Sequence, residues 1–322
     1  MCRNTVIFAL LSIACLILLL LDICSGSVFV FPWQLHDNEI VARLLWNLRV
    51  PKALTAILAG AALSVSGLMM QTLFRNPLAG PYLLAVSSGA GLGVAIATMC
   101  GTMLAVQVVS FSIVAAAIIG STLVLLLVLA IAKKVSSNVS LLIVGMMLGS
   151  IAGALVNLIQ NFSNPDALKL FVVWTLGSLD NVGWTELRIL FPVLAIGGVL
   201  CLFLLKPLNG LLLGENYAQG LGVNVHRTRL MIVLATGLLA GGVTAWCGPI
   251  AFIGVAVPHI ARGILRTSNH RLTMPMAALI GANILLCCDV LASLFTYPLP
   301  ISTMSALFGA PIIIWIIVRG KS

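Results

Sequence analysis

Charged residues are scarce in this chain: Asp, Glu, Lys and Arg make up 8% of its 322 residues, whereas hydrophobic residues make up 61%. A soluble domain carries about 25% charged residues, so this chain has too few polar side chains to cover a water-facing surface. The alternating segments of about ten residues that membrane β-barrels require are also missing. The composition therefore predicts an all-α polytopic membrane protein.

Several motifs that carry chemistry are absent as well. No P-loop of the form G-x-x-x-x-G-K-[ST] occurs, so any energy from nucleotide must come from a partner chain. None of the eight cysteines forms a C-x-x-C pair with metal spacing, and most lie within apolar runs, where they are predicted to be buried hydrophobic residues. No Ser/His/Asp or Cys/His combination is evident. These absences argue against an enzyme and against a metal or cofactor site.

Long apolar runs are what the chain does contain, and they predict about ten membrane-spanning helices, since about 20 apolar residues cross a bilayer as a helix. The eighth run is short and contains Pro258, so neighbouring helices are expected to bury it. The first run is predicted to be a retained helix rather than a signal peptide. The expected spans are Val6–Ile23, Ala53–Met70, Leu83–Met99, Val106–Ala132, Leu141–Asn161, Ile189–Leu205, Leu230–Trp246, Ile253–Leu265, Met274–Phe295 and Met304–Val318.

The distribution of Lys and Arg predicts the orientation of these spans. With a cytoplasmic N-terminus, twelve basic residues lie inside and five outside, as the positive-inside rule favours. Both termini are then cytoplasmic, and the chain forms one transmembrane domain over residues 1–322, with no soluble domain. The net charge of +9 is therefore topological and does not indicate nucleic-acid binding.

Four features each allow a functional and a structural interpretation. The glycines of Ser88–Gly93 resemble a dinucleotide loop but lie within an apolar span, which favours close helix packing. His259 and Asp289 fall within spans, where ionisable residues are costly. His259 is a candidate for a metal ligand or proton relay, or for a structural role near the Pro258 kink; Asp289 is a candidate for a substrate contact or for a structural ion pair, and both roles stay open. The methionines are candidates for lining a path or for packing: Met69, Met70, Met146 and Met147.

A polar stretch from Leu211 to Arg229 separates two long apolar runs and contains Glu215, the only acidic residue between Leu187 and Cys288. Three interpretations compete for this stretch: an incidental loop, a catalytic carboxylate, or a surface that contacts a partner. The predicted topology places the stretch on the cytoplasmic side, and the missing P-loop supplies a reason for such a partner.

Taken together, several motifs resemble one family. The first set contains Leu48–Lys52 with Ala59–Leu63 and Gln71–Ala79, the second runs from Leu213–Glu215 to Leu221–Val223, and the third joins Gly248–Gly254 to Val257–His259 and Gly309–Pro311 with Trp315. In order and spacing these motifs resemble the FecCD-type permease family, the membrane subunits of type II ABC importers for iron chelates, haem and cobalamin. The likeness covers nearly the whole chain.

The resemblance implies the type II ABC importer permease fold in the cell inner (plasma) membrane, with ten helices per subunit. It also implies a second permease subunit, identical or not, and two cytoplasmic ATPase subunits that use ATP and Mg. A periplasmic or lipid-anchored substrate-binding protein completes the transporter, and no cofactor of the permease itself is implied. The expected cargo is a ferric siderophore; haem or cobalamin is the alternative within the family, and an ion-coupled secondary transporter is the alternative from another class.

The resemblance also assigns roles to particular residues. A cytoplasmic coupling loop at about 207–229 is expected to seat on the ATPase, through Gly214, Glu215, Ala218, Leu221 and Gly222. The inner gate is expected at Asn76, Leu78, Asn138 and Val139, although the small hydroxyl pair of the cobalamin member is not kept at Asn138-Val139. Arg49 and Lys52 match two basic positions that dock the binding protein. The family's third basic docking position is occupied by Ser293 in this chain, a departure that weakens docking or shifts it elsewhere.

Overall fold

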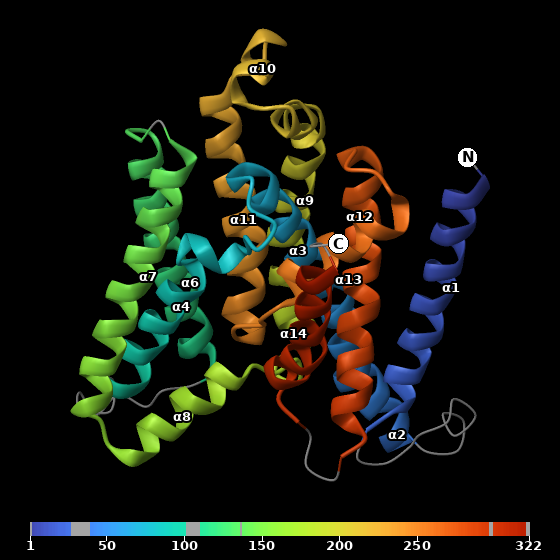
Figure 1. The fold of residues 1–322 in the computed structure, drawn as a ribbon. Helices are drawn as coiled ribbons and strands as arrows, with labels where there is room; N and C mark the ends of the chain where they lie inside the picture. The colour runs from blue at the N-terminus through green and yellow to red at the C-terminus, as the bar shows by residue number, and fades with distance from the viewer. Residues whose placement is uncertain (1, 27–38, 101–109, 136, 296–298, 320–322) are drawn as a thin grey trace. The chain divides into compact units, whose positions relative to one another are not determined.

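The computed structural model describes residues 2–26, 39–100, 110–135, 137–295 and 299–319, and within these ranges the chain forms helices and no strand (Figure 1). Five elements are short: α2 (Glu39–Leu44), α10 (Glu215–Gly220), a 3₁₀-helix at Pro81–Leu84 and π-helical segments at Leu45–Arg49 and Ile96–Cys100. The longer helices are α1 (Cys2–Cys24), α3 (Val50–Phe74), α4 (Val86–Ala95), α6 (Ser110–Ala132), α7 (Asn138–Asn161), α8 (Pro165–Leu176), α9 (Trp184–Leu212), α11 (Val225–Cys247), α12 (Ile253–Leu265), α13 (His270–Ser293) and α14 (Ile301–Arg319).

The expected spans fall on these helical segments, with Leu83–Met99 running through the end of the 3₁₀-helix, α4 and a π-helical segment, which confirms the all-α polytopic prediction. Seven helices of the described residues are long and apolar enough to cross a membrane. Three shorter apolar helices, Val86–Met99, Ile253–Leu265 and Ile301–Ile314, match the third, eighth and tenth expected spans. Residues 106–109 of the fourth expected span lie outside the described residues. None of the expected spans covers α8, a shorter helix that begins at Pro165.

The chain divides into two compact units, and α3 and α9 each run through both. The first unit comprises Met1–Leu68, Ser178–Pro192 and Ile250–Ser322. Within it α13 packs against α1, α12 and α14. Glycine allows α3 to approach α13 closely, because a Cβ on Gly60 would run into the backbone carbonyl of Gly281. Small residues of this kind are the usual means by which membrane helices pack.

The second unit comprises Met69–Gly177 and Val193–Pro249. Within it α6 packs against α4 and α11, and α4 also contacts α7. The glycines of Ser88–Gly93 lie on α4, where a Cβ on Gly89 or Gly93 would strike the backbone of α6 at Gly120 or Ala116. The packing interpretation of this motif is therefore confirmed, and no strand precedes it as a dinucleotide loop requires, since the preceding element is the Pro81–Leu84 3₁₀-helix.

Polar residues fix where several helices begin. Asn164, Asn224 and Asn269 are the N-caps of α8, α11 and α13, and each side chain accepts a hydrogen bond from a backbone N–H in the first turn. Such caps satisfy donors that would otherwise be left unpaired at a helix start. Gly248 ends α11 with φ +73°, and a Cβ there would strike the carbonyl of Trp174, so only glycine fits.

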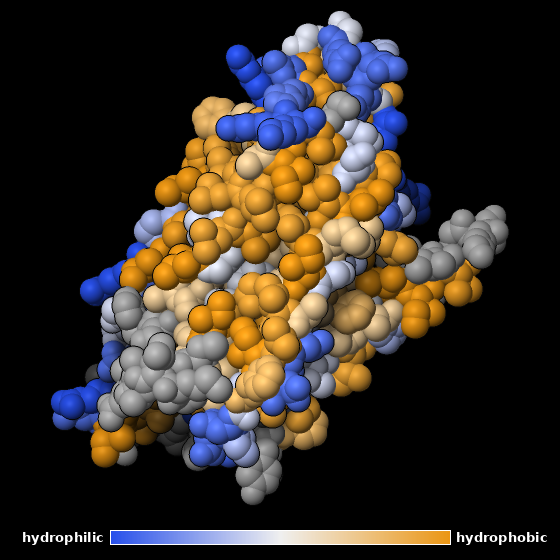
Figure 2. All heavy atoms as spheres, turned by 90° about the vertical axis from the view of Figure 1, so that its left-hand side faces the viewer, coloured by the Kyte–Doolittle hydropathy of each residue, from blue (hydrophilic) through white to orange (hydrophobic). Residues whose placement is uncertain are grey.

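The face drawn in Figure 2 is largely hydrophobic, with hydrophilic residues gathered towards its top and bottom. On α7 much of this surface is exposed and apolar, including Ile143, Met147 and Ile151. The four candidate methionines divide accordingly: Met69 and Met70 are fully buried, as packing residues are, whereas Met146 and Met147 are exposed on α7. Lipid or a second protein chain is the natural cover for such a face.

Candidate functional site

The polar stretch between α9 and α11 contains the short helix α10, which begins at Glu215. Gly214 precedes it with φ +118°, a conformation that favours glycine. A Cβ at this position would lie 2.8 Å from Nη2 of Arg75, so the guanidinium of Arg75 is packed against the start of α10. Ala218 is fully buried and lies close to Gly210 of α9. The helix is therefore held firmly within the second unit.

Around α10 the stretch exposes large apolar side chains, namely Leu213, Tyr217 and Leu221. Leu221 follows the last turn of α10, and Gly222, with φ +81°, ends that turn. Exposed apolar side chains that cluster on a short, well-fixed element are typical of a contact surface. Among the predicted coupling residues, Leu221 belongs to this exposed surface, whereas Gly214 and Ala218 are buried and support it from within.

The carboxylate of Glu215 contacts two side chains of the second unit, those of Asn138 and Arg229. Asn138 donates its side-chain amide N–H to Oε1 of Glu215, and Nη2 of Arg229 lies 3.6 Å from the same oxygen. Arg229 is 2% exposed and donates through Nη1 to the carbonyl of Val135, at 2.9 Å. A buried cation and an amide thus hold the carboxylate of Glu215, and these contacts fix the position of the start of α10. They do not form the kind of site that catalysis by a carboxylate needs.

Asn138, the first residue of α7, links this acid to a second element. Its Nδ2 also donates to the carbonyl of Leu73, near the end of α3, at 2.8 Å. Both partners are acceptors, so the orientation of the amide is settled: only its NH₂ group can serve both. We refer to Leu73, Val135, Asn138, Glu215 and Arg229 as the Glu215 network.

The other predicted gate residues lie at or near these elements. Asn76 follows α3 and accepts a hydrogen bond at Oδ1 from the backbone N–H of Leu78, at 2.9 Å, which fixes a tight turn. Leu78 and Val139 are both exposed. The structure thus connects one predicted gate segment, at Asn138-Val139, to the end of the helix that leads into the other, at Asn76–Leu78.

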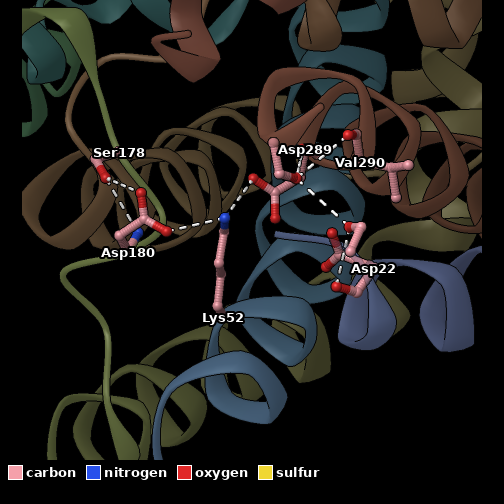
Figure 3. Close-up of polar contacts among 8 residues, drawn as sticks. Asp22, Lys52, Ser178, Asp180, Asp289 and Val290 are labelled. Carbon is pink, nitrogen blue, oxygen red and sulfur yellow. Dashed lines mark hydrogen bonds and ion pairs between the residues drawn. The ribbon is translucent and has the colours of Figure 1, made fainter. Parts of the chain in front are cut away.

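A second group of charges lies in the first unit around Lys52, near the start of α3 (Figure 3). Its Nζ lies 2.9 Å from Oδ1 of Asp180 and 3.2 Å from Oδ1 of Asp289, on α13. Asp22 of α1 lies beside Asp289 (Figure 3). We refer to Asp22, Lys52, Asp180 and Asp289 as the Lys52 cluster. Lys52 is thus the cation partner of Asp289, a residue that lies within an expected span.

Burial differs sharply within the Lys52 cluster. The side chain of Asp289 is 5% exposed and that of Lys52 19%, whereas that of Asp180 is 61% exposed. Asp180 belongs to the segment before α9, where it accepts a hydrogen bond from the hydroxyl of Ser178. A buried carboxylate requires a cation or hydrogen-bond donors, and Lys52 supplies that cation to Asp289.

Serines and an arginine surround the Lys52 cluster. Ser293, at the end of α13, donates to the carbonyl of Asp289 at 2.6 Å and lies 3.5 Å from the hydroxyl of Ser25. Arg49 donates through Nη1 to the carbonyls of Ile23 and Cys24 at the end of α1, where a cation is favoured. Both predicted docking cations, Arg49 and Lys52, therefore have partners within the first unit, and their docking role stays a prediction.

The sequence did not identify Asp180, Arg229 or Arg75 as members of these sites. The sequence carried no signal for Asp180, whereas the need of Asp289 for a cation pointed to one of the few basic residues expected on the outer side, such as Lys52. For Arg229 the signal was its place in the basic end of the Leu211–Arg229 stretch. His259 is half-buried on α12, and among the described residues no group of three or more His, Cys, Asp or Glu could hold a metal ion.

Comparisons with known proteins add independent findings. Residues 14–319 match the model of the FecCD transport family. The chain is similar to the vitamin B12 import system permease protein BtuC of Yersinia enterocolitica, with 38% identity over 95% of this chain and 91% of the relative. It is also similar to the BtuC proteins of Escherichia coli, at 36% identity over 96% of this chain and 94% of the relative, and of Klebsiella pneumoniae, at 35% over 97% and 93%.

Two solved structures share the fold. One is described as an inward-facing conformation of a putative metal-chelate type ABC transporter; it covers 99% of both chains with a TM-score of 0.87 and 29% identity. The other, PsaBC from Streptococcus pneumoniae in complex with Fab, has a TM-score of 0.55 at 17% identity and covers 88% of this chain and 92% of its own, a likeness of fold alone.

Proposed function

This chain belongs to the FecCD transport family, and we propose that the cargo it carries across the membrane is cobalamin. It is the multi-pass permease subunit of an ABC importer, which works with ATPase subunits and a substrate-binding protein and is not itself an enzyme. The family assignment replaces the ion-coupled alternative. The observation that supports the cargo is the similarity, over nearly the whole chain, to permeases named for vitamin B12 import.

A ferric siderophore is the second candidate cargo. The residues at one predicted gate position, Asn138-Val139, depart from the small hydroxyl pair of the cobalamin member. One structural relative is described as a metal-chelate type transporter. These two observations support a ferric siderophore as cargo. The similarity to permeases named for vitamin B12 import supports cobalamin more directly.

We further propose that α10 is the coupling helix that contacts an ATPase subunit. Its fixed backbone and its exposed Leu213, Tyr217 and Leu221 suit a docking surface for a partner. In the proposed topology both chain termini and α10 are cytoplasmic, and the Lys52 cluster lies near the outer surface. Asn76, Leu78, Asn138 and Val139 then surround the inner end of the path, and Arg49 and Lys52 lie where the binding protein docks.

Uptake by the complete transporter tests the cargo. The chain would be reconstituted into proteoliposomes with its ATPase, its binding protein and its second permease subunit. Labelled cyanocobalamin, a ferric hydroxamate siderophore and haem would then be offered separately, with and without ATP inside. The proposal expects ATP-dependent accumulation of cyanocobalamin at a rate well above that of the other two. ATP-dependent uptake of the ferric chelate alone would contradict cobalamin and select the second candidate.

A further inference from the structure

One side-chain amide in the Glu215 network joins three helices of the second unit. Asn138, at the start of α7, donates one hydrogen bond to Glu215 of α10 and another to the carbonyl of Leu73 in α3. An asparagine amide has two N–H groups, and here each serves a different helix. Asn138 therefore lies at the junction of the proposed coupling helix and the two segments that lead to the proposed gate.

We infer that Asn138 is a positioning residue that passes the position of α10 to both gate segments, an inference that rests on the proposed coupling role of α10. When α10 shifts with an ATPase subunit, the bond from Asn138 must either break or carry the start of α7 with it. Val139 is the next residue of α7, and α3 leads directly to Asn76 and Leu78. Movement at one amide can thus reach both sides of the gate.

The remaining contacts of Glu215 and Gly214 restrict the same two elements. Arg229, the other partner of Glu215, is anchored at the carbonyl of Val135, three residues before Asn138. The guanidinium of Arg75, which follows α3, is packed against Gly214. The contacts of Arg75 and Asn138 thus connect the start of α10 to the end of α3 and the start of α7, and Arg229 of α11 connects it to the segment between α6 and α7. A contiguous set of contacts of this kind is one physical route by which two sites are coupled.

The alternative is that Asn138 merely stabilises the local fold. A structural role would lower the amount of folded complex, whereas a positioning role lowers the work obtained from each ATP. The informative quantity is therefore a ratio: cyanocobalamin taken up per ATP hydrolysed in proteoliposomes. A second ratio, ATP hydrolysis with binding protein over hydrolysis without it, reports coupling whatever the cargo proves to be.

The test compares Asn138→Ala, Glu215→Ala and the double variant in the complete reconstituted transporter, with Asn157→Ala as a control. Asn157 is an exposed asparagine of the same helix, so its substitution removes the same group without touching the network. Each single variant is expected to lower both ratios about five-fold or more, the lower end of typical coupling between sites. The double variant should fall no further, because both changes remove one shared link.

Glu215→Gln keeps an acceptor for Asn138 and should retain most of the coupling that Glu215→Ala loses. Wild-type ratios in Asn138→Ala, or a double variant whose losses multiply, would overturn the inference. Failure of the wild-type complex to import cyanocobalamin would instead count against the proposed cargo, since the binding-protein ratio would still report on the link. Failure of the wild type to assemble with an ATPase would count against the proposed function as a whole.

Discussion

The Lys52 cluster and the Glu215 network use the few charges of this chain in opposite ways. In the first unit a single ammonium, that of Lys52, serves Asp180 and Asp289, with Asp22 beside them. In the second unit a single carboxylate, that of Glu215, is held by a buried guanidinium and an amide. One site has a surplus of acids around one cation; the other has one acid with two donors.

Because of this difference, substitution of a residue in the Lys52 cluster and substitution of a residue in the Glu215 network are expected to have different effects. Asp289 is nearly inaccessible, so its cation compensates a buried charge and mainly supports the fold. Glu215 is partly exposed and lies on a short helix next to an exposed apolar surface, so its bonds mainly set the position of that helix. We therefore expect changes in the Lys52 cluster to alter stability, and changes at Glu215 to alter coupling.

The largest effect is expected for Lys52→Met, which leaves the carboxyl of Asp289 buried without a cation. Removing one partner of a buried ion pair typically costs about 3–5 kcal/mol, so the purified protein should unfold at a clearly lower temperature or denaturant concentration. Lys169→Met, at an exposed lysine, is the matched control. Addition of Asp289→Asn to Lys52→Met should restore part of the loss. Equal stability of Lys52→Met and the control would show that Asp289 does not depend on Lys52.

A smaller loss of stability is expected for Arg229→Met, in the Glu215 network. The substitution removes the charged donor to the part-buried carbonyl of Val135, and a hydrogen bond that involves a charged group typically contributes about 1.5–3 kcal/mol. Arg227→Met, two residues away at an exposed position, should have little effect on unfolding. Equal unfolding temperatures for Arg229→Met and Arg227→Met would show that the buried guanidinium of Arg229 adds no more stability than the exposed one of Arg227.

The docking prediction is tested by Arg49→Glu. Reversal of this charge should weaken association with the binding protein roughly ten-fold, because basic positions are expected to receive acidic residues of that partner. A titration of the reconstituted permease complex with binding protein measures the dissociation constant, and Arg188→Glu, at an exposed position of the first unit, is the control. An affinity that does not change with Arg49→Glu would remove Arg49 from the docking surface.

The smallest effect is expected for Asp180→Asn. Its side chain is 61% exposed, and exposed ion pairs typically contribute at most about 1 kcal/mol. Thermal unfolding should therefore change little, and Lys52 keeps Asp289 as its partner. A loss of stability as large as that of Lys52→Met would mean that the exposed acid, and not Asp289, is the main partner of Lys52.

Hydropathy alone predicted the long helices correctly, because a bilayer-spanning helix needs one continuous apolar run and little else. The short helices α8 and α10 did not follow from that signal; α8 begins at an Asn-Pro-Asp sequence whose capping pattern is local and weaker. The motifs singled out Glu215 and Asn138 as site residues, and their functional roles stay predictions.

Their contacts could not be predicted from one sequence, because Asn138 and Glu215 are 77 residues apart. The pairing of Lys52 with Asp289 likewise depends on how α3 packs against α13. That packing is set by the close approach at Gly60 and Gly281, and a glycine in an apolar run does not reveal which helix it will face.

Glu215→Arg tests most directly the claim that α10 connects this permease to its ATPase. The substitution places a cation beside Arg229 and removes the acceptor for Asn138. The measurement is ATP-driven uptake by the complete transporter in proteoliposomes, with co-purification of the ATPase recorded for the same preparation. Uptake is expected to fall to the level seen without ATP, through lost assembly or lost coupling. ATP-driven uptake at the wild-type rate would contradict the assignment of α10 as the coupling helix.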